Sequence, residues 1–290
     1  DALDNKELPA SLAIVGGGVI GMEFASFFSS LGVQVTVVEM LDEVLNGMDK
    51  ELSALLRAEY AKRGVKFLLS TKVTSLSPND DGVAVAYENA EGTGSVVAEK
   101  ILMSVGRRPV TKGFGLENLG LVLTERGNVA VNNKMQASVP GVYVCGDLTG
   151  FSLLAHTAVR EAEVAVHAIL DKEDTMSYRA IPGVVYTNPE IAGVGQTEES
   201  LLAKGIPFHV IKLPMAYSGR FVAENEGVNG MCKVFIGEDK TILGAHILGN
   251  PASEIITLAG MAVEMKLTVA EWKKIVFPHP TVAEIFREAL

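Results

Sequence analysis

The chain has 290 residues and a net charge of −10 at pH 7, because 35 acidic side chains outnumber 25 basic ones. Hydrophobic residues make up 48% and charged residues 21%, a balance typical of a globular protein and not of a disordered one. The acidic charge, without a cluster of Lys or Arg, argues against nucleic acid or an anionic membrane as the main partner. The apolar runs stop well short of the roughly 18–20 residues that a membrane span needs.

The only cysteines, Cys145 and Cys232, lie far apart in the sequence. Their number and spacing indicate neither a disulfide framework nor a zinc site, so we expect no bound metal. Both lie in apolar segments, which predicts buried thiols. The polar start, DALDNKELPA, shows no signal peptide and no initiating Met, and we interpret it as a linker. We expect a reducing compartment, either the cytoplasm or, in a eukaryote, the mitochondrial matrix.

Residues 11–106 predict strands and helices that alternate around a parallel sheet. Short apolar runs indicate the strands, and helical apolar spacing indicates the helices. Asp49 is a suitable N-cap, and Gly64 a suitable stop, for the second helix. The expected strands are 11–15, 33–39, 65–69 and 101–106, the helices are 19–31 and 50–63, and 83–87 pairs with 95–98 in a hairpin. This order predicts a doubly wound α/β sheet with an inserted hairpin.

The pattern changes twice in the rest of the chain. Residues 127–175 predict strands at 128–132 and 141–147 and an amphipathic helix at 152–170, which is too little for a separate domain. Beyond residue 176 the strands precede the helices, which predicts an α+β domain. The expected strands there are 183–186, 208–213, 231–236 and 241–248, and the helices lie near 252–266, 268–275 and 281–288. We therefore divide the chain into residues 1–126, 127–175 and 176–290.

The sequence GGGVIG at residues 16–21 follows a strand and opens a helix, which is the setting that a dinucleotide-binding G-x-G-x-x-G requires. Gly16 permits the tight turn, Gly18 lets the backbone approach a pyrophosphate, and Gly21 lets the helix pack against the strand. The pyrophosphate would lie on the helix N-terminus. Glu39 ends the next strand, where a carboxylate binds ribose hydroxyls and repels a 2′-phosphate. The motif predicts NAD in preference to NADP; the alternative is a structural glycine turn.

The sequence GVYVCGD ends an apolar segment in Gly-Asp. At the carboxyl end of a strand, the carboxylate of Asp147 is placed to accept a hydrogen bond from a ribityl or ribose hydroxyl. The alternative is an aspartate that caps the following helix or shapes a turn. The spacing alone does not decide between these two interpretations.

The sequence FPHPTVAE holds His279 between two prolines, which restrict the loop. If the loop doubles back, the carboxylate of Glu284 accepts a hydrogen bond from one ring nitrogen and leaves the other to move protons. The alternative is structural: Thr281 and Glu284 form a capping box, as Thr268 and Glu271 do, and His279 is a surface residue. We expect most of the other histidines to be structural.

The order of these motifs resembles that of the flavin-dependent pyridine nucleotide–disulfide oxidoreductases. The resemblance runs from about residue 8 to residue 290 and is strongest to the members that oxidise dihydrolipoamide. It rests on LAIVGGGVIGMEFA, SVGRRPV, GVYVCGDLTG, LLAHTAVREAE, YTNPEIAGVGQTE and HPTVAEIFREAL. The resemblance implies an NAD-binding domain at residues 1–126, the second half of an FAD-binding domain at 127–175 and a dimerisation domain at 176–290.

The resemblance also implies roles for individual residues. His279 would be the catalytic acid/base and Glu284 the residue that orients it, acting in the active site of the other subunit of a homodimer. Asp147 would bind the flavin ribityl chain, and Glu23 would lie near the nicotinamide. The implied NAD-contacting positions are Gly16, Gly17, Gly18, Val19, Ile20, Gly21, Met22, Glu23, Glu39, Val73 and Gly106, and the implied flavin-contacting positions are Asp147, Leu153, Leu154, Ala155 and His156.

Two features of the family have no counterpart in this sequence: a first glycine motif for FAD and a redox cysteine pair spaced C-x4-C. We therefore expect a carboxyl-terminal portion of a flavoenzyme, with weak FAD binding and no turnover alone. The resemblance implies that the whole enzyme passes electrons from dihydrolipoamide through a disulfide and FAD to NAD+, within a 2-oxo acid dehydrogenase complex. Two alternatives stay open. One is a module for dinucleotide binding and dimerisation only, with an exposed apolar face at 127–170; the other is a sister reductase for another disulfide or for mercuric ion.

Overall fold

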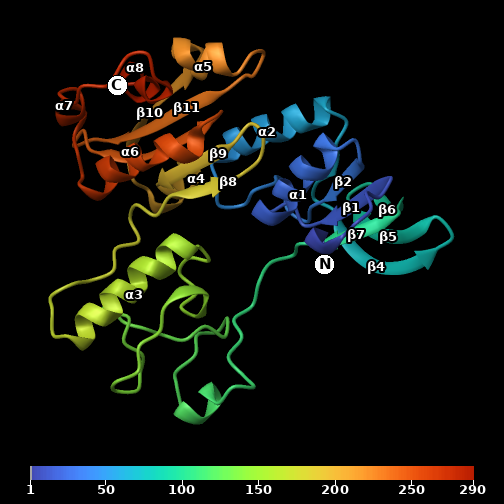
Figure 1. Ribbon diagram of the computed structural model, residues 1–290, viewed down its shortest axis with the longest axis horizontal. Helices are drawn as coiled ribbons and strands as arrows, with labels where there is room; N and C mark the ends of the chain where they lie inside the picture. The colour runs from blue at the N-terminus through green and yellow to red at the C-terminus, as the bar shows by residue number, and fades with distance from the viewer. Residues whose placement is uncertain (1) are drawn as a thin grey trace. The chain divides into compact units, whose positions relative to one another are not determined.

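The computed structural model describes residues 2–290, which form two compact units (Figure 1). The larger unit comprises residues 2–106 and Pro182–Leu290, and the smaller unit is Arg107–Ile181. Within the described residues, no helix has the length and apolar character needed to cross a bilayer. The division of the chain at residues 126 and 175 stays a prediction.

The first part of the larger unit is a four-stranded parallel sheet in the order β3-β2-β1-β7. Its strands are β1 (Ser11–Val15), β2 (Gln34–Val38), β3 (Lys66–Leu68) and β7 (Lys100–Met103), its helices are α1 (Val19–Ser30) and α2 (Lys50–Lys62), and a 3-10 turn (Ala2–Asp4) precedes them. The predicted doubly wound sheet is therefore confirmed. Parallel strands end at the same edge of a sheet, so the glycine turn after β1 and Glu39 after β2 are neighbours.

A three-stranded antiparallel sheet is inserted between β3 and β7. Its strands are β4 (Lys72–Asn79), β5 (Gly82–Asn89) and β6 (Gly92–Ala98). The predicted hairpin of β5 and β6 is confirmed, and β4 is an additional strand. Seven of the eight residues of β4 are exposed, so the strand lacks the apolar alternation that would have indicated it in the sequence.

The carboxyl-terminal part of the larger unit is a five-stranded antiparallel sheet in the order β10-β11-β12-β9-β8. Its strands are β8 (Gly183–Val185), β9 (Ile191–Gly195), β10 (Phe208–Pro214), β11 (Met231–Gly237) and β12 (Ile242–Leu248). The helices are α4 (Glu198–Lys204), α5 (Gly219–Glu224), α6 (Ala252–Glu264), α7 (Val269–Trp272) and α8 (Ile285–Glu288), with 3-10 turns at Met215–Tyr217 and Val282–Glu284. The predicted α+β arrangement is confirmed. The sequence did not predict β9, α4 or α5: β9 contains two glycines, and both helices are too short to show a helical period.

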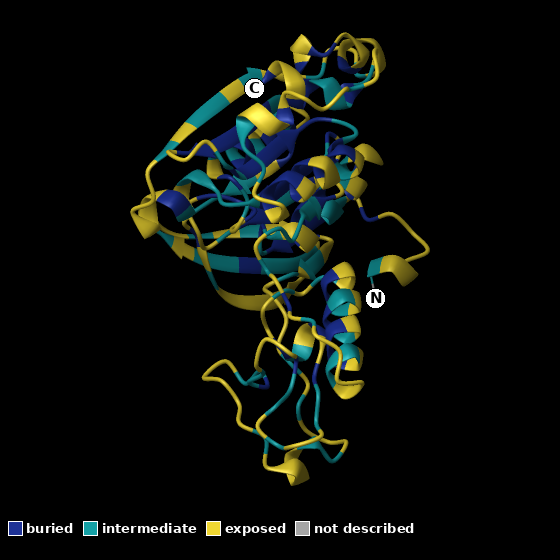
Figure 2. Cartoon of the chain, turned by 90° about the vertical axis from the view of Figure 1, so that its left-hand side faces the viewer, coloured by how far each residue is buried: buried dark blue, intermediate teal, exposed yellow. Residues whose placement is uncertain are grey.

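One hydrophobic core runs through both parts of the larger unit. It joins Ile14 of β1 to Ile191 of β9 and Leu248 of β12, all of them buried. The buried hydroxyl of Tyr60 also links the two parts, because it donates to the carbonyl oxygen of Asn188 at 3.0 Å and accepts from the N–H of the same residue. In Figure 2 the buried segments gather on the strands and on the helices packed against them. The two parts of this unit are therefore held together by shared packing.

The smaller unit is built around α3 (Ala155–Ile169), with 3-10 turns at Leu116–Leu119 and Gly146–Leu148. The predicted helix at 152–170 is confirmed, with a later start. The predicted strands at 128–132 and 141–147 are wrong, because these segments form only isolated bridges. The bridged pairs are Leu123 with Val129, Val131 with Ala137 and Gln136 with Tyr143. A strand needs a continuous ladder of hydrogen bonds with a neighbour, and single bridges do not supply one.

The two cysteines lie in different surroundings. Cys232 in β11 is fully buried, and burial raises the pKa of its thiol to about 12, so the prediction for this residue is confirmed. The prediction for Cys145 is wrong, because this residue is exposed. The segment before the Gly146–Leu148 turn directs Val144 inward and its neighbour Cys145 outward, and no adjacent strand covers it.

Candidate functional site

The glycine turn after β1 is tightly packed at two positions and open at a third. Gly16 has a φ of +101°, a left-handed conformation that favours glycine, and a Cβ there would lie 2.5 Å from the carbonyl oxygen of Ser104. A Cβ on Gly21 would overlap the carbonyl oxygen of Gly16. No atom lies within 4 Å of the Cβ position of Gly18. The turn therefore packs against the protein at its ends and leaves space for a ligand at Gly18.

Glu39 closes this turn from the end of β2. Its Oε2 accepts the N–H of Gly17 at 2.5 Å, and its Oε1 accepts the N–H of Leu41 at 2.8 Å. Gly18 is the N-cap of α1 and supplies no side-chain hydrogen bond, so the first N–H groups of this helix are available to an anion. These residues fit a dinucleotide, since the helix end suits a pyrophosphate and the fixed carboxylate suits ribose hydroxyls.

The other predicted residues of α1 differ in exposure. Val19 and Ile20 are exposed at the start of the helix. The side chain of Met22 is fully buried, and its N–H donates to the carbonyl oxygen of Gly18 at 2.9 Å, so Met22 contributes packing and helix structure. Glu23 is half-buried, and its Oε1 accepts the N–H of Tyr186 at 2.9 Å. This bond ties α1 to Tyr186, the residue that directly follows β8 of the carboxyl-terminal sheet.

Val73 and Gly106 lie on separate elements of the larger unit. Val73 is half-buried in β4 and packs against the small cluster of buried residues formed by β1, β5 and β6. Gly106 follows β7 with a φ of +107° and is exposed. Their roles as NAD-contacting residues stay predictions.

In the smaller unit, Asp147 is exposed on the Gly146–Leu148 turn. The turn is held from α3 by the fully buried Glu161, whose Oε2 accepts the N–H of Gly146 at 2.5 Å. The other oxygen of Glu161 accepts the hydroxyls of Tyr178 at 2.6 Å and Thr149 at 3.2 Å. Helix α3 begins only at Ala155, so Asp147 does not cap it. Asp147 is thus exposed to solvent on a turn that hydrogen bonds to Glu161 of α3 hold in place.

The start of α3 carries the other predicted flavin-contacting residues. Leu153 is half exposed, and Leu154 is the N-cap, which makes no side-chain hydrogen bond. Ala155 and His156 form the exposed first turn of the helix. The helix therefore offers N–H groups and an apolar surface, which suits a ligand with both polar and apolar parts.

The loop before α8 brings His279 and Glu284 together. The ring Nδ1 of His279 lies 2.9 Å and 3.2 Å from the two carboxylate oxygens of Glu284, and the ring is exposed. Glu284 also accepts the N–H of Thr281 at 2.7 Å, which is one half of the predicted capping box. The hydrogen bond from Thr281 and the neighbouring imidazole hold the pKa of the Glu284 carboxyl below its usual range.

This arrangement decides which ring nitrogen of His279 exchanges protons. A carboxylate at Nδ1 favours the neutral tautomer with its hydrogen on that nitrogen. Nε2 then has a free lone pair on an exposed ring and suits a general base. One carboxylate thus caps the turn before α8 and contacts the imidazole of His279. The catalytic roles of His279 and Glu284 stay predictions.

Sequence reasoning missed two fully buried charged residues. Glu161 lies on the buried face of α3, between Thr157 and Val164, and a carboxylate at that spacing was the available signal. Lys233 is fully buried in β11, and the signal was a single lysine within the apolar strand MCKVFIG. Charged residues are almost never fully buried unless they are paired. The positions of Glu161 and Lys233 therefore indicated that each side chain has a buried polar partner, but the sequence alone does not identify that partner.

Two profiles of one protein family match this chain. Residues 1–162 match the pyridine nucleotide-disulphide oxidoreductase family. The chain belongs to this family. Residues 181–290 match the dimerisation domain of the same oxidoreductases. The α/β fold and the dimerisation domain inferred from the sequence are confirmed.

Relatives of this chain include dihydrolipoyl dehydrogenases. The protein from Geobacillus stearothermophilus is 36% identical over 99% of this chain and 61% of its own length. The mitochondrial protein from Homo sapiens is 38% identical over 99% of this chain and 57% of its own length. The chain thus spans about three fifths of the curated relatives that it matches.

Solved structures of the family agree with this fold. LpdA from Mycobacterium tuberculosis matches with a TM-score of 0.90 and 30% identity, covering 99% of this chain and 62% of its own. The HOCl-induced flavoprotein disulfide reductase RclA from Escherichia coli, as its Cu(II) complex, matches with a TM-score of 0.89 and 26% identity, covering 99% and 66%.

Proposed function

We propose that this chain supplies the NAD+ site, half of the flavin site and the acid–base pair of a dihydrolipoyl dehydrogenase. The observation that carries the proposal is the glycine turn closed by Glu39 and open at Gly18. Family membership and identities of 36% and 38% to dihydrolipoyl dehydrogenases support the choice of reaction. RclA, a sister disulfide reductase, matches at the lower identity of 26%.

The residues of the larger unit would bind NAD+ and select it. A bound nicotinamide would accept a hydride from a reduced flavin. The N-terminus of α1 would bind the pyrophosphate next to Gly18, and Glu39 would accept the ribose hydroxyls. The carboxylate of Glu39 would repel the 2′-phosphate of NADP+.

His279 would take a proton from a thiol of dihydrolipoamide through Nε2. Removing this proton raises the fraction of thiolate, which is the species that attacks a disulfide. Glu284 would hold the ring and stabilise its protonated form. The family's dimerisation domain supports a homodimer. In this dimer His279 would serve the partner's active site, and the whole enzyme would act within a 2-oxo acid dehydrogenase complex.

The smaller unit would contribute Asp147 and the start of α3 to the flavin site. Asp147 is exposed on its turn and would accept a hydrogen bond from a ribityl hydroxyl. The 290 residues contain no C-x4-C pair, so we expect no turnover of dihydrolipoamide with NAD+ by this chain alone. Robust turnover by the purified chain would contradict this expectation.

Calorimetric titration with NAD+ and NADP+ tests the dinucleotide site. We expect saturable binding of NAD+ and at least about ten-fold weaker binding of NADP+, a difference of about 1.4 kcal/mol. Glu39→Gln should narrow this difference, while Glu23→Gln, which lies away from the 2′ position in the proposal, should leave it unchanged. Absence of NAD+ binding, or equal affinity for both nucleotides, would refute the proposal.

A module for dinucleotide binding and dimerisation only is the second candidate. Exposed apolar residues in the smaller unit favour it, since a stable free surface seldom exposes so many. Among those more than half exposed are Phe151, Val159, Val166 and Ile169. The absorption spectrum after addition of FAD and gel filtration separates the candidates. A retained flavin band supports the flavin half-site, and a colourless protein supports the module.

A further inference from the structure

Residues 41–50 connect the glycine turn to the carboxyl-terminal sheet. At the turn, the N–H of Leu45 donates to the carbonyl oxygen of Gly17 at 2.9 Å. Val44 is buried against the same glycine, and a Cβ on Gly17 would lie 2.9 Å from Val44 Cγ1. The N–H of Leu41 binds the Glu39 carboxylate. The segment therefore forms the back wall of the turn that the proposed dinucleotide would occupy.

The far end of this segment is fixed by a buried ion pair. Asp49 is the N-cap of α2, and its Oδ1 accepts the N–H of Leu52 at 3.1 Å. Its Oδ2 accepts from the ammonium of Lys233 at 2.7 Å. Both side chains are fully buried, and Lys233 lies in β11 of the carboxyl-terminal sheet. The start of α2 is thus anchored from a different part of the chain.

Lys233 binds two further carboxylates, Glu51 of α2 at 2.9 Å and Glu198 of α4 at 3.0 Å. Burial alone would lower the pKa of this ammonium, but hydrogen bonds to Asp49, Glu51 and Glu198 outweigh burial and raise the pKa above its usual range. Lys233 therefore stays charged. The three carboxylates fix the position of the ammonium, so this buried charge links the start of α2 and the start of α4 to β11.

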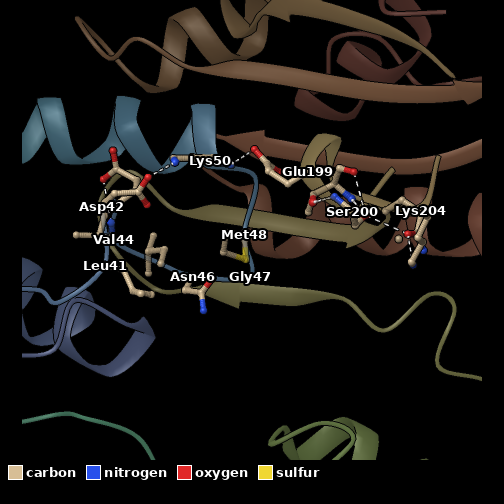
Figure 3. Close-up of a pocket in the computed structure, with 15 residues that line it drawn as sticks. Leu41, Asp42, Val44, Asn46, Gly47, Met48, Lys50, Glu199, Ser200 and Lys204 are labelled. Atoms are coloured by element: carbon tan, nitrogen blue, oxygen red, sulfur yellow. Dashed lines mark hydrogen bonds and ion pairs between the residues drawn. The ribbon is translucent and has the colours of Figure 1, made fainter. Parts of the chain in front are cut away.

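A cavity lies beside this segment, so packing does not hold it on that side. The cavity has a volume of about 680 Å³ and is bounded by residues 41–50 on one side and 195–204 on the other (Figure 3). Across it, the N–H of Lys50 contacts Glu199 of α4 at 3.3 Å. Val44 and Leu45 of the segment belong to the hydrophobic core shared with the carboxyl-terminal sheet, and the buried cluster of Lys233 ties the end of the segment to the same sheet by charged hydrogen bonds.

We propose that Lys233 is a positioning residue for the dinucleotide site: it holds residues 41–50, and through them the back of the glycine turn, in the geometry that binds NAD+. The inference rests on the proposed function for its ligand. It assigns to the carboxyl-terminal sheet a part in dinucleotide affinity, which this sheet exerts on the turn at Gly16–Gly18 through residues 41–50.

The test compares three variants of the 290-residue chain. Lys233→Met leaves the buried carboxylate of Asp49 without its ammonium partner and risks misfolding. The informative variant is therefore Lys233→Met/Asp49→Asn, which removes both charges and keeps an N-cap. We expect it to melt as a folded protein and to bind NAD+ at least ten-fold more weakly than the unchanged chain. Lys212→Met is the matched control: Lys212 also binds Glu51, at 2.6 Å, but is exposed, and we expect affinity within two-fold.

Hydrogen exchange without any ligand separates this inference from the proposed function. In the double variant, the amides of Gly17, Leu41 and Leu45 should exchange at least ten-fold faster, while those of β1 keep their rates. If the unchanged chain does not bind NAD+, the proposed function is wrong, and the exchange rates alone test the positioning role of Lys233. A folded double variant with unchanged exchange at these amides, or with NAD+ affinity within two-fold, overturns the positioning role.

Discussion

Two apolar segments of equal length have different structures in this molecule. β1, SLAIV, and residues 141–145, GVYVC, each run into a glycine. β1 pairs with β2 on one side and β7 on the other over consecutive residues, and four of its five residues are buried. The second segment makes one bridge, between Tyr143 and Gln136, and Cys145 is exposed. An apolar run becomes a strand only where neighbouring strands complete its hydrogen bonds.

The same contrast applies to what stabilises each unit. The larger unit has a continuous hydrophobic core that its parallel sheet and its carboxyl-terminal sheet share. In the smaller unit, the described core cluster centres on four buried residues, Met135, Val164, Ala165 and Met176. There the carboxylate of Glu161 and the bonds of Asp174 hold the loops to α3. The larger unit therefore depends on close packing, and the smaller unit on a few polar contacts.

The largest expected effect tests the packing of the larger unit at Gly21. Gly21→Ala places a methyl group against the carbonyl oxygen of Gly16, and we expect the free energy of unfolding to fall by about 3 kcal/mol despite the better helix propensity of alanine. Denaturant unfolding followed by the fluorescence of Trp272, the single tryptophan, measures it.

Gly18→Ala is the control for this change, since its methyl group meets no atom within 4 Å. We expect stability within about 0.5 kcal/mol of the unchanged chain and weaker NAD+ binding. Equal destabilisation by the two substitutions would show that packing does not distinguish the two positions.

The next effect tests the polar contacts of the smaller unit. Glu161→Gln places an amide among three donors, the buried Gly146 and Thr149 and the half-buried Tyr178, and leaves at least one without its carboxylate acceptor. We expect a local loss of about 2 kcal/mol, or about 30-fold faster hydrogen exchange at the Gly146 amide. Glu163→Gln, on the exposed face of the same helix, is the control and should leave that rate unchanged.

A smaller, pH-dependent effect involves Asp174. Hydrogen bonds from Arg160 and His167 hold the pKa of this carboxyl well below its usual value of 3.8. A lowered folded-state pKa means that the carboxylate stabilises the smaller unit above pH 3.8 and that this contribution is lost as the pH falls below it. Pulse proteolysis between pH 7 and pH 2.5 should show this loss.

In Asp174→Asn, proteolysis of the smaller unit should be faster already at pH 7. Its rate should also change less between pH 7 and pH 2.5, because the variant lacks the carboxyl group that titrates. Asp171→Asn, an exposed neighbour, should behave like the unchanged chain. A pH profile that is the same for the unchanged chain and for Asp174→Asn would contradict the assignment to Asp174.

The smallest effect concerns an exposed ion pair on α2. Lys62 lies 2.7 Å from Glu59 and is two-thirds exposed. Lys62→Met should change the free energy of unfolding by less than about 0.5 kcal/mol, because solvent screens the pair. A loss above about 1 kcal/mol in the same fluorescence experiment would show that surface charge matters more to the larger unit than its core suggests.

Much of the fold could be read from the sequence, and the reason is local. The strands of the parallel sheet, α1 and α2 were predicted because their apolar residues repeat with the period of the element. The N-cap role of Asp49 and the capping box at Thr268 were also predicted, since each involves residues within one turn. β4 was missed because its residues are polar and its pairing with β5 supplies the structure.

The candidate site divides in the same way. The position of Glu39 at the end of β2 and the contact of His279 with Glu284 followed from short motifs, whereas the hydrogen bond from Gly17 to Glu39 did not. Burial of Lys233 beside Asp49 did not, because these residues meet only after two sheets pack together. The burial of Glu161 likewise depends on Tyr178 and Gly146 folding back onto α3.

The sequence by itself determined the parallel sheet, the glycine turn, the acidic end of β2 and the histidine–glutamate loop, because each depends on residues that are close along the chain or on a simple repeat. Only the tertiary structure decided which apolar runs became strands, which cysteine was buried and which charges found partners. The physical reason is that burial, strand pairing and the pairing of buried charges are properties of neighbours in space. A local pattern states what an element requires, and the folded chain determines whether a neighbour supplies it.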